Sequence, residues 1–374
     1  MHIGFDAKRF FFNNSGLGNY SRGVVRILAE YYPENQYTLF SPREGNPNNF
    51  PVPAGSSVVY PSGAFWKKFS SVWRSYRMGE SVKSRGIDIF HGLSNELPAD
   101  ITQSGAKSVL TMHDIIFIHF PELYKPFDRY IYTKKYRSSC EKADRIIAIS
   151  KQTKGDLVNT WGINPDNIDI VYQGCDPIFY RQAGKEERAA VKAKYGLPEN
   201  YIVSVGTIEE RKNLMLTVKA MAEHGIGHDM DLVACGRRTP YADKIMEYAQ
   251  SKNIAHRIHF IHNVSFADLP AIYQMAKVSV YASFYEGFGI PILEAFNSGI
   301  PVITTEGGVF PETGGNAAMY INPYDTEQMA VALKDIINDN NLRQLMISKG
   351  LDYAANFRDD KIARDLMAVY SKLL

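Results

Sequence analysis

Short apolar runs alternate with longer amphipathic segments along the whole chain. The runs are rich in β-branched and aromatic residues, which is typical of buried strands, and the segments between them repeat apolar residues at helical spacing. In the first half we expect strands at 2–6, 37–41, 56–60, 87–91, 108–112, 145–149 and 168–172, and helices at 19–31, 65–85, 128–142 and 151–160. Strands that alternate with helices predict parallel sheets with right-handed crossovers.

A second alternation begins at residue 201 and predicts a second sheet. Its strands are expected at 201–206, 230–235, 257–261, 278–282, 301–304 and 318–321. The charged, alanine-rich stretch before it, within 181–198, is interpreted as a linker. A chain of 374 residues is too long for one ordinary core. We therefore predict an α/β fold in which two doubly wound, Rossmann-like domains, at 1–180 and 199–355, face a central cleft.

Composition narrows the classes of partner and compartment. A net charge of +2 gives no case for nucleic acid as a partner. The three cysteines are far apart and odd in number, which fits a reducing compartment and neither a disulfide framework nor a zinc site. The chain enters its first strand at once, and no run approaches the roughly 18 apolar residues of a spanning helix. We expect a cytoplasmic protein.

One helical segment, 65–77, carries an aromatic stripe and four basic residues mostly on the other face. Such a helix can rest on an anionic membrane surface or face a lipid-linked acceptor. It can equally pack in the core with a solvated basic side. Both interpretations stay open, so peripheral contact with the inner face of a membrane is one of the expected properties.

The segment 281–301 carries the strongest functional signal. Glu286 and Glu294 lie on either side of a Gly-Phe-Gly turn that leads from a buried strand into a helix. Free amides at the start of such a helix, at the carboxyl end of a parallel sheet, bind anions. The two carboxylates cannot hold a phosphate, but they can accept hydrogen bonds from hydroxyls. A site with amides for phosphate and carboxylates for hydroxyls suits a nucleotide sugar.

A pair of cations, Arg211 and Lys212, follows the strand and turn that end at Gly206. We expect them to open a helix, where cations are disfavoured by the helix dipole, so that something anionic should compensate them. An arginine that binds two oxygens beside a lysine that acts as a point charge suits a diphosphate. The alternative is a solvated helix start.

Three weaker features lie in the first half. Gly16 and Gly18 precede a helix and would let backbone amides approach a phosphate, or they form a plain turn. His113 and Asp114 follow a buried strand, where ligands bind in α/β domains, although a His-Asp pair is more often structural. His91 has the same placement with weaker support.

Two patterns are set aside. Asp229 and Asp231 match the D-x-D pattern of metal-dependent sugar transferases, but they precede their strand, at the end away from the expected ligand edge. Glu286 and Glu294 can be imagined as the acid and nucleophile of a hydrolase, yet their surroundings look built for phosphate. We expect no metal and no cofactor.

With these residues in place, the chain resembles the retaining glycosyltransferases of family 4, which have the GT-B fold of two facing Rossmann-like domains. Residues 286–295 look like the E-x7-E motif of that family. The supporting matches, in the order of the family, are Gly16 to Tyr20, Ile147-Ala148-Ile149-Ser150, Gly206 with Arg211-Lys212-Asn213, and Pro311-Glu312.

The resemblance implies a role for each matched residue. Arg211 and Lys212 would neutralise the donor diphosphate, Glu286 would bind hydroxyls of the donor sugar, and His113 would sit beside the reacting centre. The other implied donor contacts are Gly16, Gly18, Gly206, Asn263 and Val264 near the base, the turn residues Gly287, Phe288, Gly289 and Ile290, and Glu294 at the ribose hydroxyls. His91 and Asp114 would lie on the acceptor side. Catalysis would be same-face attack without a covalent nucleophile, driven by charge stabilisation and positioning.

The family also implies that the last helix, in 356–374, packs back on the N-terminal domain. The tail differs from the family pattern, because Phe357-Arg358-Asp359 stands where Phe-Ser-Trp is frequent. The helix at 65–77 and the surroundings of His113 are similar to bacterial transferases that build polysaccharides, O-antigens or lipopolysaccharide, several of which use GDP-mannose. The expected function is transfer of a sugar from GDP-mannose or a UDP-sugar to a glycan, free or lipid-linked.

Alternatives from other classes remain open. The same fold could support a nucleotide-sugar epimerase or an inverting transferase. The chain could also be a non-catalytic sugar-nucleotide-binding subunit, although the intact carboxylates and cations argue against it.

Overall fold

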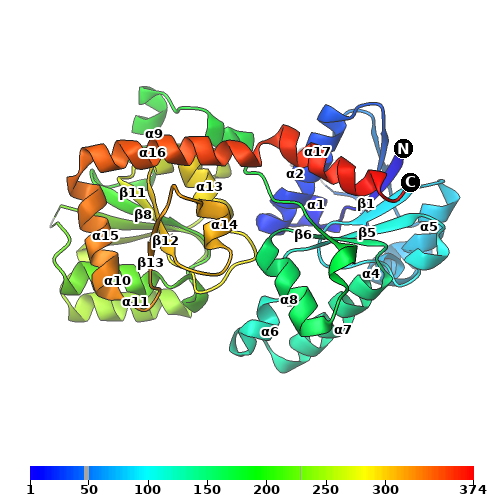
Figure 1. The fold of residues 1–374 in the computed structure, drawn as a ribbon, viewed down its shortest axis with the longest axis horizontal. Coiled ribbons are helices and arrows are strands. Elements are labelled where there is room, and N and C mark those ends of the chain that lie inside the picture. The colour runs from blue at the N-terminus through cyan, green and yellow to red at the C-terminus, as the bar shows by residue number, and fades with distance from the viewer. Residues whose placement is uncertain (46–49, 228) are drawn as a thin grey trace. The chain divides into compact units, whose positions relative to one another are not determined.

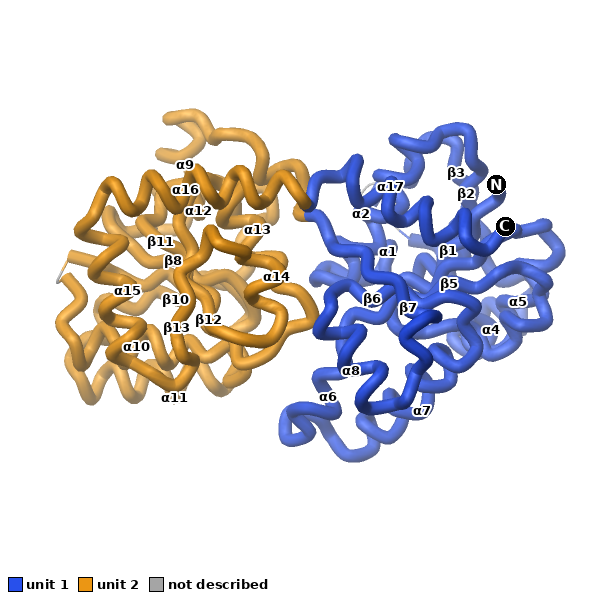
Figure 2. Tube along the Cα trace, in the orientation of Figure 1, with its two compact units in different colours: residues 1–174, 357–374 blue, residues 175–356 orange. Residues whose placement is uncertain are grey.

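The computed structural model describes residues 1–45, 50–227 and 229–374, and these divide into two compact units. The first unit comprises residues 1–174 and 357–374, and the second comprises residues 175–356 (Figure 2). Each unit contains one sheet whose recorded strand pairs are all parallel, flanked by helices (Figure 1). The predicted α/β fold with two doubly wound sheets is therefore confirmed.

The first unit is built on a seven-stranded sheet in the order β3-β2-β1-β4-β5-β6-β7. Its strands are β1 (His2–Asp6), β2 (Gln36–Phe40), β3 (Ser56–Val59), β4 (Ile89–Gly92), β5 (Lys107–Met112), β6 (Arg145–Ala148) and β7 (Ile168–Ile170). The strand order reverses between β1 and β4. At such a reversal the connections leave the carboxyl edge of the sheet in opposite directions, which opens a crevice for ligands.

Helices cover both faces of this sheet. They are α1 (Lys8–Phe12), α2 (Gly16–Tyr31), α3 (Ala64–Lys68), α4 (Ser70–Tyr76), α5 (Met78–Ser84), α6 (Ile116–His119), α7 (Pro126–Lys142), α8 (Lys151–Trp161) and α17 (Asp359–Ser371). Alternate strand residues supply two cores. Val109 and Ile147 pack with α1, α2 and α17, whereas Leu110 and Ile146 pack with α7 and α8. A strand that is buried on both faces explains the continuous apolar runs in the sequence.

One predicted helix is wrong in detail. The segment 65–85 is three short helices, α3 to α5, because the backbone leaves the helical region at Phe69 (φ −106°, ψ 42°) and Arg77 (φ −136°, ψ 3°). Trp73 and Arg74 point into the unit, while Phe65 and Tyr76 are more than half exposed. The expected aromatic stripe is therefore split between a buried and an exposed side.

The second unit is built on a six-stranded sheet in the order β10-β9-β8-β11-β12-β13. Its strands are β8 (Tyr201–Val205), β9 (Asp231–Cys235), β10 (Ile258–Ile261), β11 (Val278–Tyr281), β12 (Val302–Thr305) and β13 (Met319–Ile321). Its helices are α9 (Lys185–Tyr195), α10 (Leu214–Glu223), α11 (Pro240–Ser251), α12 (Leu269–Met275), α13 (Ile290–Asn297), α14 (Phe310–Gly314), α15 (Thr326–Asn338) and α16 (Asn340–Ala354). The strand order reverses between β8 and β11, so ligands are expected beside these two strands.

The region expected to be a linker, 181–198, is structured and lies in the second unit. It contains α9, which contacts α12. Its charged, alanine-rich sequence is that of a surface helix with one buried apolar position, Val191, and Gly196 ends the helix in the left-handed conformation. The charge density that suggested a linker therefore belongs to the solvent side of a helix.

The final helix, α17, belongs to the first unit and lies beside α2 (Figure 1). Arg26 on α2 and Asp359 form an ion pair at 2.7 Å. The apolar side of α17 is buried, and the hydroxyl of Tyr370 lies 2.7 Å from Nδ1 of His91 at the end of β4. Nε2 of the same ring lies 2.7 Å from Oγ1 of Thr111. A buried polar network thus attaches the end of the chain to the centre of the first sheet.

No helix in the described parts of the chain is long and apolar enough to cross a membrane.

Replacement of Tyr370 by Phe tests this network. The change leaves a ring nitrogen of His91 buried without its partner, which costs about 1–3 kcal/mol of unfolding free energy. All three tryptophans lie in the first unit, so urea unfolding followed by tryptophan fluorescence reports on that unit. The midpoint should fall, whereas Tyr31→Phe, at an exposed ring, should change it little. An unchanged midpoint for Tyr370→Phe would contradict the role of the network.

Candidate functional site

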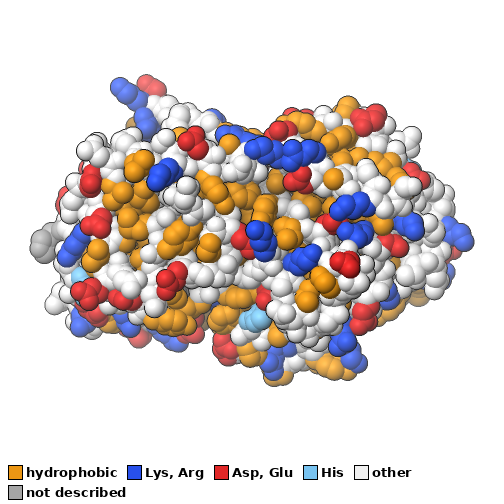
Figure 3. All heavy atoms as spheres, in the orientation of Figure 1, with side chains coloured by type: hydrophobic (Ala, Val, Ile, Leu, Met, Phe, Trp, Pro, Cys, Tyr) orange, Lys and Arg blue, Asp and Glu red, His pale blue; other side chains and the backbone are white. Residues whose placement is uncertain are grey.

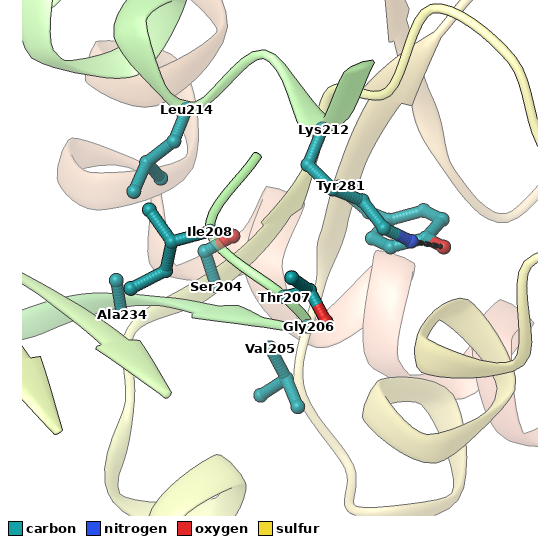
Figure 4. Close-up of a pocket in the computed structure, with 9 residues that line it drawn as sticks. All are labelled: Ser204, Val205, Gly206, Thr207, Ile208, Lys212, Leu214, Ala234 and Tyr281. Atoms are coloured by element: carbon teal, nitrogen blue, oxygen red, sulfur yellow. Dashed lines mark hydrogen bonds between the residues drawn. The ribbon is translucent and has the colours of Figure 1, made fainter. Parts of the chain in front are cut away.

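A recess lies where the carboxyl ends of β8 and β11 meet in the second unit. Its cavity volume is only about 10 Å³, and it is lined by residues 204–208 at the end of β8 and just after it, together with Lys212, Leu214, Ala234 and Tyr281 (Figure 4). Gly206 has φ +144°, and its amide bonds to the carbonyl of Cys235 at 2.9 Å. A Cβ atom at Gly236 would lie 1.8 Å from the Gly206 carbonyl oxygen. The two glycines therefore let two connections pass in direct contact, and Gly206 lines the recess.

Arg211 and Lys212 lie in a single 3₁₀ turn, Glu210–Lys212, and not in the first turn of a helix. The expectation that they open a helix is wrong, because Asn213 adopts the left-handed conformation (φ +55°) and α10 starts only at Leu214. The Asn213 side chain donates to the carbonyl of Pro323 at 2.8 Å, which holds this break in place. The cations are thereby turned toward the end of β11.

The two cations meet on one carboxylate oxygen. Oε1 of Glu286 lies 2.7 Å from Nη1 of Arg211 and 2.5 Å from Nζ of Lys212. Arg211 also pairs with Glu209 at 2.8 Å and donates to the carbonyl of Tyr285. Burial alone would raise the pKa of Glu286, but the charges of Lys212 and Arg211 outweigh it and lower the pKa to about 2. Glu286 is therefore ionised at neutral pH and supplies part of the anionic compensation that the sequence led us to expect from a ligand.

Tyr281, the last residue of β11, completes this cluster and was missed in the sequence. Its hydroxyl accepts a hydrogen bond from Nζ of Lys212 at 2.7 Å, and the two groups meet in Figure 4. Burial and the nearby charge of Glu286 raise the pKa of Tyr281, so the phenol stays protonated. A tyrosine at the carboxyl end of a central strand is the one signal that could have indicated it.

The turn 287–289 leads from Glu286 into α13. Gly289 has φ +112°, which favours glycine, and Phe288 is buried with its carbonyl bonded to the hydroxyl of Thr313 at 2.7 Å. Helix α13 then starts at Ile290, with Pro291 in its first turn. The predicted strand, glycine turn and helix are thus present, and the start of α13 lies at the carboxyl edge of the sheet.

Glu294 occupies a different environment from Glu286, although both belong to the same motif. It lies within α13, is buried, and accepts a hydrogen bond from the hydroxyl of Tyr273 at 3.0 Å. Burial raises its pKa to about 7, and the charge of Asp176 acts in the same direction. Close to neutrality, this carboxyl is therefore divided between its neutral and ionised forms.

Asn263 and Val264 follow β10, the edge strand next to β9. Asn263 is exposed and has φ +57°, a conformation that asparagine tolerates better than most residues. The preceding His262 bonds through Nδ1 to the carbonyl of Gly236 at 2.8 Å, which ties this connection to the one that follows β9.

In the glycine turn of the first unit, the amide of Gly18 already has hydrogen-bond partners within the turn. Gly16 starts α2, and the amide of Gly18 bonds to the carbonyl of Ser15 at 2.9 Å and to Oδ1 of Asn13 at 3.1 Å. A Cβ atom at Gly18 would lie 1.9 Å from the Asn13 carbonyl oxygen. The amide of Gly18, which was expected to face a phosphate, thus stabilises the turn, and the glycine is needed for close packing.

His113 is buried directly after β5. Nε2 donates to the carbonyl of Leu93 at 2.9 Å, Nδ1 lies 3.5 Å from the amide nitrogen of Gln173, and the ring meets Tyr20 edge-on at 4.6 Å. Burial lowers the pKa of His113 to about 4, so the imidazole is neutral at pH 7. The neighbouring Asp114 accepts from the amide of Ile116 at 3.1 Å and so stabilises the start of α6.

His91 has a structural role in the first unit. Both of its ring nitrogens bond to buried hydroxyls, and burial lowers its pKa to about 3. Its position at the end of a strand gave the same signal as that of His113. The difference lies in Tyr370, a partner 279 residues away that no local pattern reveals.

The structure thus brings Gly206, Arg211, Lys212 and Glu286 into one cluster, whereas Glu294 is buried within α13 of the same unit. Within the described ranges, no group of three or more His, Cys, Asp or Glu side chains is arranged to hold a metal ion. Asp231, set aside as part of the D-x-D pattern, pairs with His259 at 2.7 Å.

Two family models together match most of the chain. The model described as "Glycosyl transferases group 1" matches residues 187–352, and the one described as "Glycosyltransferase Family 4" matches residues 21–179. The O-antigen chain mannosyltransferase B of Escherichia coli is 28% identical over 96% of this chain and 96% of its own length. The O-antigen chain mannosyltransferase RfbU of Salmonella typhimurium is 28% identical over 68% of this chain and 66% of its own length.

Solved structures share the fold at low sequence identity. A glycosyltransferase from Rickettsia africae superimposes with a TM-score of 0.76 at 18% identity, over 100% of this chain and 98% of that one. Anabaena Alr3699/HepE, solved in complex with UDP-glucose, superimposes with a TM-score of 0.77 at 15% identity over 100% of both chains. The fold is that of the GT-B glycosyltransferases.

The raised pKa of Glu294 predicts a pH-dependent stability. The folded-state pKa of about 7 exceeds the ordinary value of 4.5, so the folded form holds a proton that the unfolded form releases. The unfolding free energy should therefore fall by roughly 3 kcal/mol as the pH rises through this window, and level off above it. Calorimetric unfolding of Glu294→Gln should lack this fall of the unfolding free energy with pH. The difference in unfolding free energy between wild type and variant therefore measures the contribution of Glu294.

The exposed carboxyl of Glu327 provides the control, and Glu327→Gln should follow the wild type at every pH. A difference between wild type and Glu294→Gln that does not change from pH 5 to pH 7.5 would contradict the raised pKa.

Proposed function

The chain belongs to glycosyltransferase family 4 and has the GT-B fold, and from this premise we propose that it is a retaining enzyme. The proposed reaction moves a sugar from a nucleoside diphosphate to a hydroxyl of a glycan. The proposed setting is the assembly of a bacterial surface polysaccharide, which the names of the O-antigen relatives support.

The observation that carries this proposal is the cluster of Arg211, Lys212 and Glu286. Two adjacent cations at the carboxyl edge of a parallel sheet suit the charge of a diphosphate. The carboxylates of Glu286 and Glu209 neutralise part of the charge of the two cations. We propose that an incoming diphosphate takes over these cations, and that Glu286 then accepts hydrogen bonds from hydroxyls of the donor sugar.

For the donor we propose GDP-mannose or a UDP-sugar. GDP-mannose is supported by the relatives named as mannosyltransferases, and a UDP-sugar by the neighbour that was solved with UDP-glucose. In either case the ribose hydroxyls are proposed to bind Glu294, and the base to meet the backbone of Asn263 and Val264.

The protonation states of the described residues favour electrostatic catalysis over acid–base catalysis. Glu286 is ionised and His113 is neutral at pH 7, so neither is poised to donate a proton. We propose same-face attack, in which the acceptor hydroxyl forms a bond to the anomeric carbon as the bond to the diphosphate breaks. The departing phosphate oxygen takes the acceptor proton, and Arg211 and Lys212 stabilise the charge that develops there.

Two substitutions separate binding from transfer. Lys212→Ala removes a cation from the diphosphate site, so nucleoside diphosphate should bind at least 10-fold more weakly and transfer should be lost. Glu286→Gln removes the competing negative charge, so nucleoside diphosphate should bind at least as tightly as in the wild type, while transfer falls at least 100-fold. Titration calorimetry measures the affinity for nucleoside diphosphate, and an assay with radiolabelled sugar measures the rate of transfer.

Lys277→Ala, at an exposed lysine of the same unit, is the matched control and should bind and turn over normally. Full turnover by Glu286→Gln would remove this residue from the proposed mechanism.

A donor panel tests the proposed function itself. A true donor stabilises the folded protein by mass action, so one nucleotide sugar among GDP- and UDP-sugars should raise the melting temperature most. With that donor, NMR of the product should show the anomeric configuration of the donor, and transfer should continue in excess EDTA. An inverted product would indicate an inverting transferase, and loss of activity that Mn²⁺ restores would contradict the metal-free mechanism.

A further inference from the structure

A second and larger recess lies in the first unit, at the carboxyl ends of β1 and β4. Its cavity volume is about 450 Å³, and it lies between α4, the connection after β4, and α7. Four cationic and two anionic side chains line it, so its net charge is positive. None of these residues belongs to the cluster around Glu286.

The floor of this recess is a buried ion triad. The guanidinium of Arg74 pairs with Asp6 at 2.6 Å and with Glu96 at 2.9 Å. Burial would raise the pKa of Glu96, but the charges of Arg74 and Lys135 outweigh it and lower that pKa. Glu96 therefore remains ionised, and Arg74 engages both carboxylates from within the protein.

The wall formed by α7 carries three further cations, Lys134, Lys135 and Lys142. Among the described residues, none of the three forms an ion pair. Lysines gathered on one side of a recess repel one another, and a ligand with two negative charges would relieve that repulsion. The charge of the recess therefore favours a phosphate or diphosphate group.

Hydrogen bonds tie the walls of the recess to one another. The connection after β4 is tied to α7 by the amide of Leu97, which donates to Oγ of Ser139 at 3.0 Å. It is tied to α4 by the amide of Ala99, which donates to the carbonyl of Ser75 at 2.7 Å. A site whose walls are held in this way loses little entropy on binding.

Exposed apolar side chains continue from both walls. On α4 and the residue before it, Phe69, Val72 and Tyr76 are exposed, and on α7 Phe127 and Tyr130 are exposed at 72% and 57%. Nζ of Lys134 lies 4.5 Å from the ring centre of Tyr130. On the visible face of this unit, basic and hydrophobic side chains lie next to one another (Figure 3). Such a surface suits a ligand whose charged group continues into a hydrocarbon chain.

We propose that this recess binds the phosphate or diphosphate group of a lipid-linked acceptor. Lys134, Lys135 and Lys142 hold the anion, and the exposed rings of α4 and α7 contact the lipid next to it. The inference rests on the proposed function, of which it specifies the class of acceptor. It also gives the aromatic-basic segment 65–77 a role that does not require the whole segment to lie on a membrane.

The test compares two probes, farnesyl diphosphate and inorganic diphosphate, by titration calorimetry of the full chain. The measurements use the Lys212→Ala background, so that the nucleotide site does not contribute. Farnesyl diphosphate should bind at least 10-fold more tightly than inorganic diphosphate. Lys134→Gln with Lys135→Gln should weaken farnesyl diphosphate at least 10-fold, and Tyr76→Ala should weaken it while leaving inorganic diphosphate unchanged.

The matched control is Lys83→Gln with Lys107→Gln, two exposed lysines of the same unit, and it should bind both probes normally. Unchanged affinity for farnesyl diphosphate in the Lys134/Lys135 variant would overturn the inference. Equal affinities for the two probes would overturn the proposed contact with the lipid and would indicate a site for free phosphate or diphosphate.

A separate binding measurement distinguishes failure of this inference from failure of the proposed function. With Lys212 intact, Lys134→Gln with Lys135→Gln should bind GDP or UDP like the wild type. Loss of nucleotide binding in that variant, at residues outside the nucleotide site, would contradict the separation of the two sites.

Discussion

The carboxylate of Glu286 is the contact on which the site of the second unit depends. Arg211 and Lys212 are adjacent in sequence, and two like charges about 4 Å apart near a protein surface repel by about 4 kcal/mol. The carboxylate between them offsets that repulsion and fixes both side chains. Because Glu286 follows β11 and the cations follow β8, a single oxygen atom joins the two connections that flank the reversal of strand order.

The two carboxylates of one motif differ because their partners differ. Glu286 lies against two cations and has a pKa of about 2, whereas Glu294 is buried beside Tyr273, near the charge of Asp176, and has a pKa of about 7. The spacing of the motif therefore specifies where the carboxyl groups lie and not how they titrate. An acid–base pair would need one proton donor beside the reacting bond, and the fully ionised Glu286 does not provide it.

Local patterns predicted most of the fold and the position of the central cluster. Parallel strands followed from the alternation of apolar runs with helices, and the glycine turn before α13 identified the edge at which Glu286 lies. Partners that are distant in sequence could not be predicted. Tyr273 carries no local mark, and Tyr281 has only its place at the end of a strand. His91 and His113 have the same local pattern, and only the distant hydroxyl of Tyr370 distinguishes them. The break of 65–85 into three helices also escaped prediction, because neither Phe69 nor Arg77 is a residue that commonly ends a helix.

The return of the chain to the first unit has a consequence for its biosynthesis. The whole second unit is inserted between residues 174 and 357 of the first. During translation the second unit is complete as soon as residue 356 has emerged, whereas the first unit still lacks α17 and its contacts with His91 and α2. Domains usually fold in order from the N-terminus, and here the order of completion is reversed. Until α17 has emerged from the ribosome, the apolar face of α2 that it covers remains open.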